Sequence, residues 1–184
     1  MMKCSVFIAT SVDGYIAKLD GSTDWLHSFD EAPEPIDMGW EGFIDSVDCV
    51  IMGRKCIESL MKMDTKPEFW IYGDRRVIVL SNTLSEVPEH MSGLIELYSG
   101  DLSALIRQLE KEGYQNAYID GGVTIQSFLN LRLISDMSIT HAPILLGAGI
   151  PLFGNTTQKV KLEHAQAKAF ANNFIQVSYN VSYQ

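Results

Sequence analysis

Short apolar runs alternate with amphipathic helical patterns along most of the chain, and this alternation strongly constrains the fold. Runs of strand length occur at residues 5–9, 48–52, 76–80, 94–98, 117–119 and 137–141. Helix-like spacing of apolar residues occurs at residues 38–46, 54–63, 102–112 and in a segment that follows residue 122 and ends near residue 130. Strands that alternate with helices in this way predict an α/β domain with a mostly parallel sheet and helices on both of its faces.

The last part of the chain follows a different pattern. Apolar and polar residues alternate strictly between Ile175 and Tyr183, which predicts a half-buried antiparallel strand. Residues 159–167 also alternate, and Asn172 and Asn173 provide turn-forming residues between the two segments. The sequence therefore predicts a mixed sheet that ends in a C-terminal antiparallel hairpin. A length of 184 residues fits one domain, residues 1–184.

The composition excludes several classes of protein. With 46% hydrophobic and 20% charged residues, the chain does not resemble a disordered protein. No apolar run approaches the ~18 residues that a membrane-spanning helix needs. The first apolar run of the chain is too short for a secretory signal, so we expect a cytoplasmic protein.

The net charge of −9 is distributed unevenly along the chain. Residues 1–52 have a net charge of −8, whereas residues 53–76 have a net charge of +2. A chain this acidic is a poor candidate for binding nucleic acid or an anionic membrane, so we expect neither as a partner. The positive window indicates where an anionic small molecule could bind.

Cysteine and histidine spacing predicts neither a disulfide framework nor a metal site. Cys4, Cys49 and Cys56 form no C-x-x-C pair, and we expect reduced, partly buried thiols. The histidines are scattered and do not pair with one another or with a cysteine at metal-ligand spacing: His27, His90, His141 and His164.

A first candidate ligand site follows the apolar run that ends at Gly53. Glycine allows a ligand to approach the backbone, and Arg54 and Lys55 add positive charge at the start of a helix. In open α/β sheets, ligands bind at the carboxyl ends of the strands, where this turn is expected. Two solvated bases on a plain strand–helix turn would give the same pattern.

A second turn of this type contains Gly121 and Gly122, which separate a short strand from a helix. Adjacent glycines let a pyrophosphate lie against backbone amides at a helix N-terminus, although a simple tight turn also fits. Ser81 follows another strand and could either bind phosphate or cap a turn. The G-x-G-x-x-G fingerprint is absent, which disfavours an ordinary Rossmann site.

Several motifs occur together in an order that resembles the dihydrofolate reductase-like family. Within that family, they are most similar to the reductase domain at the C-terminus of the bifunctional riboflavin-biosynthesis deaminase–reductase. The resemblance covers nearly the whole chain and implies a three-layer α/β/α fold. The motifs are Ala9-Thr-Ser-Val-Asp-Gly-Tyr-Ile-Ala17, Trp25, Val50-Ile-Met-Gly-Arg-Lys55, Val79-Leu-Ser81, Ile119-Asp-Gly-Gly122 and Pro143-Ile-Leu-Leu-Gly-Ala-Gly-Ile-Pro-Leu-Phe153.

The resemblance implies an NADPH-binding site with assigned positions. Arg54, next to Gly53 and Lys55, would reach the 2′-phosphate of the adenosine, with Ser81 nearby; an arginine fork suits a phosphate dianion. The pyrophosphate would lie on the second turn, and the nicotinamide would lie near the first strand. The residues of these two regions are Gly121, Gly122, Val123 and Thr124, and Ala9, Ile16 and Ala17.

The chain departs from the family pattern at three of these positions. Cys56 replaces the threonine of the Gly-Arg-x-Thr turn, Val123 replaces a third glycine, and Asn82 replaces a basic residue. With Cys56, one hydroxyl contact to a phosphate is lost or moved to a backbone amide, and all three departures argue for weaker cofactor binding. None of them removes the helix N-termini that would hold the phosphates.

The substrate side has three candidate residues. Asp37 is the candidate catalytic carboxylate, because dihydrofolate reductases place one pocket carboxylate on a helix in a similar register. The alternative is an N-cap role for Asp37, which the ten acidic residues within residues 1–52 favour slightly. Asp13 would lie with Gly14 in a mobile loop, and Trp25 would line either the pocket or the core.

These observations lead to two hypotheses about function. In the first, the chain is an NADPH-dependent reductase of a small heterocycle, a pterin or an aminopyrimidine. In the second, it is an NADPH-binding module that has lost catalysis, which Cys56 and Val123 favour. The zinc deaminase signature H-x-E…P-C-x-x-C is absent from the chain. Relatives often pair across their terminal strands, so the resemblance also implies a homodimer.

Overall fold

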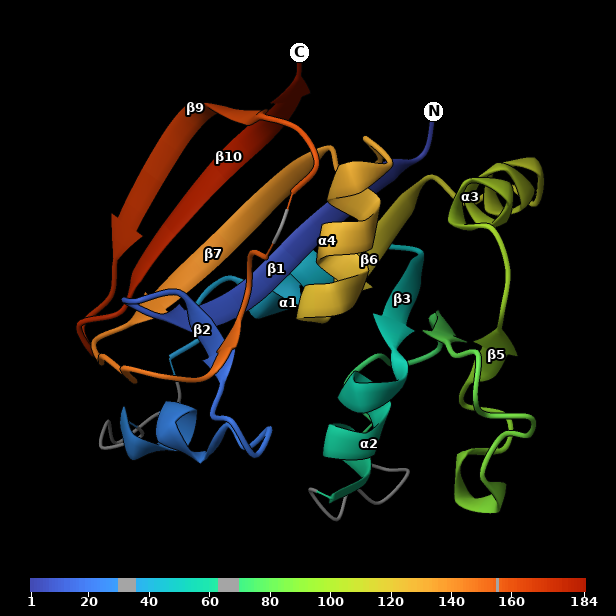
Figure 1. Cartoon of the computed structure of the whole chain (residues 1–184), viewed down its shortest axis with the longest axis horizontal. Coiled ribbons are helices and arrows are strands. Elements are labelled where there is room, and N and C mark those ends of the chain that lie inside the picture. Colours follow the sequence, from blue (N-terminus) through green and yellow to red (C-terminus); the bar gives the residue numbers. More distant parts are fainter. Residues whose placement is uncertain (30–35, 63–69, 155) are drawn as a thin grey trace.

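The computed structural model describes residues 1–29, 36–62, 70–154 and 156–184 and is organised around one eight-stranded sheet (Figure 1). The strand order across this sheet is β5-β4-β3-β6-β1-β7-β10-β9. Its strands are β1 (Lys3–Ser11), β3 (Cys49–Gly53), β4 (Arg76–Leu80), β5 (Glu96–Tyr98), β6 (Asn116–Asp120), β7 (Asp136–Ala142), β9 (Val160–Ala169) and β10 (Ile175–Tyr183).

The strand directions confirm the mixed sheet that the sequence predicts. The neighbouring pairs from β5 through β7 are all parallel. The strand β10 pairs antiparallel with both β7 and β9, so the last two strands form the expected C-terminal hairpin. A separate two-stranded sheet, which the sequence analysis did not predict, joins β2 (Tyr15–Ala17) to β8 (Ile150–Pro151).

Helices cover both faces of the sheet, as expected. Alternate residues of the central strand β3 point to opposite faces: Cys49 and Ile51 belong to one core, and Val50 and Met52 belong to the other. The first core includes residues of α3 (Leu102–Lys111) and α4 (Gly122–Asn130). The second includes residues of α1 (Trp40–Asp45) and α2 (Arg54–Lys62). The three-layer α/β/α fold is therefore confirmed.

Two short 3-10 helices complete the described elements, η1 (Asp24–Phe29) and η3 (Glu89–Met91). Trp25 of η1 is 3% exposed and packs with Ala142 and Phe174 in a third, smaller core. Among the residues that the structure describes, no helix is long and apolar enough to cross a bilayer.

The predicted start of a helix is wrong at α1 and correct at α3. The expected helix over residues 38–46 begins only at Trp40, because Gly39 adopts a left-handed conformation with φ of 91°. At α3 the prediction is confirmed, since the Asp101 carboxylate accepts a hydrogen bond from the Ala104 amide at 2.7 Å.

Candidate functional site

The two glycine turns predicted from the sequence lie in contact at the carboxyl edge of the parallel strands. The strands β3 and β6 are hydrogen-bonded neighbours, and Met52 is paired with Asp120 at their ends. A Cβ atom placed on Gly121 would lie 4.0 Å from the Gly53 backbone nitrogen. Two nine-residue helices, α2 and α4, therefore begin side by side.

The approach of the two turns leaves no room for side chains. A Cβ atom on Gly121 would lie 2.5 Å from the Cys56 sulfur, and one on Gly53 would lie 3.0 Å from the Thr124 hydroxyl oxygen. Gly121 also has a φ of 91°, which side chains of L-residues rarely tolerate. Both glycines are thus required by local packing as well as by the close approach that a ligand would need.

Residues predicted on the nicotinamide side also lie at the second turn. A Cβ atom on Gly122 would lie 2.9 Å from the Ile16 Cδ1 atom and 3.3 Å from the Pro151 carbonyl oxygen. Ala17 is buried and pairs with Ile150 in the small sheet. The strand β2 and the 143–153 segment, which are far apart in sequence, therefore meet at the start of α4.

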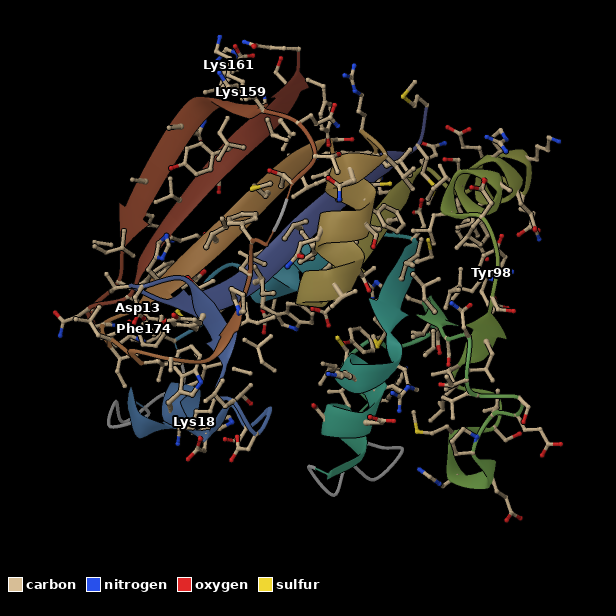
Figure 2. The ribbon with its side chains drawn as sticks, in the orientation of Figure 1. Asp13, Lys18, Tyr98, Lys159, Lys161 and Phe174 are labelled. Atoms are coloured by element: carbon tan, nitrogen blue, oxygen red, sulfur yellow. The ribbon has the colours of Figure 1, made fainter. Side chains whose placement is uncertain are left out.

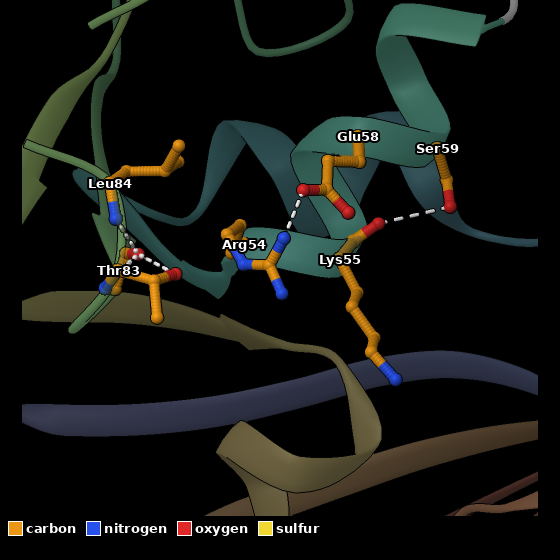
Figure 3. A network of polar contacts seen from close by, with 7 residues as sticks. Arg54, Lys55, Glu58, Ser59, Thr83 and Leu84 are labelled. Atoms are coloured by element: carbon orange, nitrogen blue, oxygen red, sulfur yellow. Dashed lines mark hydrogen bonds and ion pairs between the residues drawn. The ribbon is translucent and has the colours of Figure 1, made fainter. Parts of the chain in front are cut away.

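The two bases of the first turn differ in their environments. Arg54 is partly buried and forms an ion pair with Glu58, one helical turn further along α2. Lys55 is exposed, and its carbonyl oxygen accepts a hydrogen bond from the Ser59 hydroxyl at 3.0 Å (Figure 3). The positive charge that the sequence places at this turn is thus partly neutralised by a carboxylate.

Ser81 lies beside this turn, because Gly53 and Leu80 are paired in the sheet. Its hydroxyl oxygen accepts hydrogen bonds from the amides of Thr83 at 3.2 Å and Leu84 at 2.9 Å (Figure 3). The turn-capping interpretation of Ser81 therefore fits this structure. A hydroxyl can also donate one hydrogen bond, so the same residue can contact a phosphate.

Asp120 is a candidate residue that the sequence analysis did not identify as functional. Its carboxyl lies at the end of β6 directly before the glycine pair, and burial raises its pKa above the ordinary value. Hydrogen bonds from the Gly121 amide and Tyr118 oppose this effect. The sequence places Asp120 in the Asp-Gly-Gly turn, but only its buried surroundings distinguish it from a turn-forming aspartate.

Buried aromatic hydroxyls surround this carboxyl. Tyr118 is 5% exposed, and its hydroxyl donates to the Phe7 carbonyl oxygen at 3.0 Å. Tyr72 is 2% exposed, and burial, followed by the charge of Asp120, raises its pKa. Perturbed titratable groups gathered at a strand end are typical of functional sites.

A continuous group of aromatic rings lies next to Asp120 on the α1 and α2 side of the sheet. Phe7 and Phe43 are stacked with ring centroids 4.7 Å apart, and Phe43 meets Tyr118 edge to face at 5.1 Å. The centroid of the Trp40 ring lies 5.9 Å from the ring centroid of Phe7 and 5.9 Å from that of Tyr118. Phe7, Trp40 and Phe43 are each only partly buried.

Asp13 joins two loops that are far apart in sequence. Its two carboxylate oxygens accept hydrogen bonds from the amides of Leu146 at 3.1 Å and Gly147 at 2.7 Å. Hydrogen bonding by the Ser11 hydroxyl, and then by these two amides, lowers the pKa of Asp13. Figure 2 shows Asp13 at one end of the sheet, far from Lys159 and Lys161 at the other end. Ala9, which the resemblance places on the nicotinamide side, lies in β1 and pairs with Thr140 of the neighbouring strand β7.

Asp37 is exposed and acts as a cap for α1. One of its carboxylate oxygens accepts hydrogen bonds from the amides of Gly39 at 3.1 Å and Trp40 at 2.8 Å. Asp37 thus has the capping function of the alternative interpretation, although Gly39 occupies the N-cap position itself. Trp25, packed in the third core, matches the core alternative that the sequence left open. A catalytic role for Asp37 and a substrate contact for Trp25 stay predictions.

None of the three cysteines forms a disulfide in this structure, and Cys4 and Cys49 are buried. Burial raises the pKa of both thiols to about 12, which makes them poor nucleophiles. Burial also raises the pKa of Cys56. In the part of the chain that the structure describes, no group of three or more His, Cys, Asp or Glu residues is placed to hold a metal ion.

Comparison with known families identifies a match over nearly the whole chain. A model of the RibD C-terminal domain matches residues 3–176. The uncharacterized protein YwjB of Bacillus subtilis is 35% identical over 170 residues, which cover 91% of this chain and 92% of YwjB.

Solved structures show the same fold. A protein from Shewanella sp. PV-4, described provisionally as a riboflavin biosynthesis protein, is 40% identical with a TM-score of 0.91; the match covers 98% of this chain and 99% of that one. Dihydrofolate reductase from Enterococcus faecalis, complexed with NADP(H), has a TM-score of 0.61 at 12% identity, and the match covers 98% and 95% of the two chains.

Proposed function

This chain belongs to the RibD C-terminal domain family, and from that premise we propose that it is an NADPH-dependent reductase of a small heterocycle. Family membership and the dihydrofolate reductase-like fold support an oxidoreductase role in general. The observation that carries the finer proposal is the contact between the Gly53 and Gly121 turns at the start of two helices. Adjacent helix N-termini can hold the separate phosphates of a dinucleotide.

The residues present fit the cofactor in shape and charge. Gly53 and Gly122 keep the two turns free of side chains, and Arg54 and Lys55 supply positive charge beside them. Thr124, with its hydroxyl 3.0 Å from the position of a Gly53 Cβ atom, supplies a donor between the turns. When bound, the cofactor supplies a hydride to the carbon of a C=N or C=O bond.

The protein must supply the proton that the heteroatom of that bond takes up. We assign this role to Asp120, because its raised pKa keeps the carboxyl protonated at a higher pH than an exposed aspartate. After transfer, the Asp120 carboxylate accepts a hydrogen bond from the Gly121 amide until solvent reprotonates it. Asp37, the catalytic candidate from the sequence, already has three backbone amides as partners.

Cofactor binding is tested first with the Arg54→Ala variant. Loss of charge-assisted hydrogen bonds to the 2′-phosphate should weaken the binding of NADPH about 10- to 100-fold and leave the binding of NADH nearly unchanged. Titration calorimetry with both cofactors measures this. Arg107→Ala removes the same charge from an exposed site on α3 and is the matched control. Equal losses for both cofactors would show that Arg54 does not contact the 2′-phosphate.

Catalysis is tested with Asp120→Asn and a panel of pterins, pyrimidines and dicarbonyls, by following NADPH absorbance. The variant should keep NADPH affinity but lose most of the turnover with whichever compound the wild type reduces. Binding of NADPH without oxidation by any compound would instead favour the second candidate function, an inactive NADPH-binding module. The observation that favours it is Cys56, whose sulfur packs against Gly121 where the family has a threonine hydroxyl.

A further inference from the structure

The ion pair between Arg54 and Glu58 lies where the proposed function places the 2′ position of the cofactor ribose. Arg54 donates through Nη1 to the Glu58 carboxylate from the preceding turn of α2 (Figure 3). The two side chains are 39% and 41% exposed, so a ligand can reach both. The guanidinium therefore presents its remaining N–H donors beside a carboxylate acceptor.

Glu58 and a 2′-phosphate have opposing requirements at this position. A phosphate dianion is repelled by the carboxylate and competes with it for the same N–H groups of Arg54. A 2′-hydroxyl, in contrast, can donate a hydrogen bond to the carboxylate, as acidic residues do in sites that select NADH. The carboxylate thus acts against NADPH and in favour of NADH.

We infer that Glu58 is a specificity-determining residue that narrows the preference for NADPH over NADH. This inference rests on the proposed function of the turn. The two bases Arg54 and Lys55 and the acid Glu58 together have one net positive charge. Because Lys55 is exposed, this charge can still attract a phosphate. The site consequently accepts both cofactors with a smaller difference in affinity than an unpaired arginine would produce.

The inference is tested with Glu58→Gln, which keeps the shape of the side chain and removes its charge. NADPH should bind about five- to tenfold more tightly to this variant, because a repulsive charge near the phosphate is lost. NADH should bind equally well or more weakly. Calorimetry with adenosine 2′,5′-bisphosphate and AMP isolates the contribution of the 2′-phosphate without any need for catalysis.

The matched control is Glu112→Gln, which neutralises a carboxylate of similar exposure, 37%, in an ion pair with Arg76 at the amino end of β4. This control should leave the ratio of the two affinities unchanged. An unchanged ratio in Glu58→Gln, or weaker NADPH binding, would overturn the inference and assign Glu58 the role of orienting Arg54. If the wild type binds neither cofactor, the proposed function itself fails, which is a separate result.

Discussion

At the scale of single residues, the contact between the two glycine turns depends on Gly121. Its positive φ and the 2.5 Å distance from a Cβ position to the Cys56 sulfur are two separate constraints. The first arises from the backbone alone and the second from packing. Gly113, at the end of α3, has a similar φ of 98° but no atom within 4 Å of its Cβ position.

Substituting both glycines separates the two constraints. Gly113→Ala should cost about 1–2 kcal/mol in the free energy of unfolding, because only the left-handed backbone is strained. Gly121→Ala should cost about 3 kcal/mol or more, since the methyl group must also displace the Cys56 sulfur. Equilibrium unfolding in urea measures both. Equal costs would mean that Cys56 moves freely and that the two turns are less tightly packed.

A second residue-scale prediction concerns the stability cost of Asp120. The pKa of the Asp120 carboxyl is higher in the folded protein than in the unfolded chain. The free energy of unfolding of the wild type therefore falls as the pH rises from the pKa in the unfolded chain to the pKa in the folded protein. Asp120→Asn does not titrate and should be more stable than the wild type at pH 8, by about 2–4 °C in Tm for each kcal/mol recovered. The difference should shrink toward pH 4. Thermal unfolding across this range checks the sign; a constant difference would contradict it.

At the scale of elements, Asp13 connects two segments that flank the proposed nicotinamide side. Besides its two hydrogen bonds to residues 146 and 147, the Val12 amide donates to the Ile144 carbonyl oxygen at 2.9 Å. The Leu152 amide donates to the Gly14 carbonyl oxygen at 3.0 Å. The β1–β2 connection and the β7–β8 connection are therefore held together as one unit beside the start of α4.

Removing the Asp13 carboxylate should loosen this unit. In Asp13→Ala, hydrogen exchange at the amides of Leu146 and Gly147 should become about 10- to 100-fold faster, as expected for lost bonds to a charged acceptor. Asp13→Asn keeps one acceptor oxygen and should protect one amide. Exchange followed by NMR measures this without a substrate. Asp20→Ala, which removes a carboxylate bonded within its own loop to Ser22, should leave both amides unchanged.

At the scale of the whole molecule, the sheet ends in two unequal edges. β5 has three residues, whereas β9 has ten and lies at the other end of the strand order. A long edge strand offers unpaired backbone groups to another chain. Two apolar side chains of the hairpin, Leu162 and Ile175, are also 39% and 49% exposed.

We therefore expect the homodimer implied by the resemblance to use the β9–β10 hairpin. Sedimentation equilibrium at micromolar concentration should give a mass of two 20.5-kDa chains. Leu162→Asp should shift the equilibrium toward the monomer, because it places a charge on the hairpin surface. Leu131→Asp at the end of α4, where the side chain is 43% exposed, is the control. A wild-type monomer at all concentrations would contradict this expectation.

Local patterns in the sequence were sufficient for the long strands and helices and for the fold class. Apolar periodicity predicts the strands of the parallel sheet and the C-terminal hairpin, because side-chain direction repeats within each element. The small β2–β8 sheet was missed, because its strands have three and two residues and no period to detect. The sequence likewise indicated both glycine turns and the two roles open to Asp37.

Tertiary structure alone decided how these parts combine into a site. The order of strands brings Gly121 against Gly53, and the buried residues Tyr72 and Tyr118 lie beside the half-buried Asp120, whose pKa desolvation raises. Asp13 finds partners 133 and 134 positions away. Periodicity reports which face of an element is buried, whereas desolvation and hydrogen bonding depend on which distant atoms pack against that face.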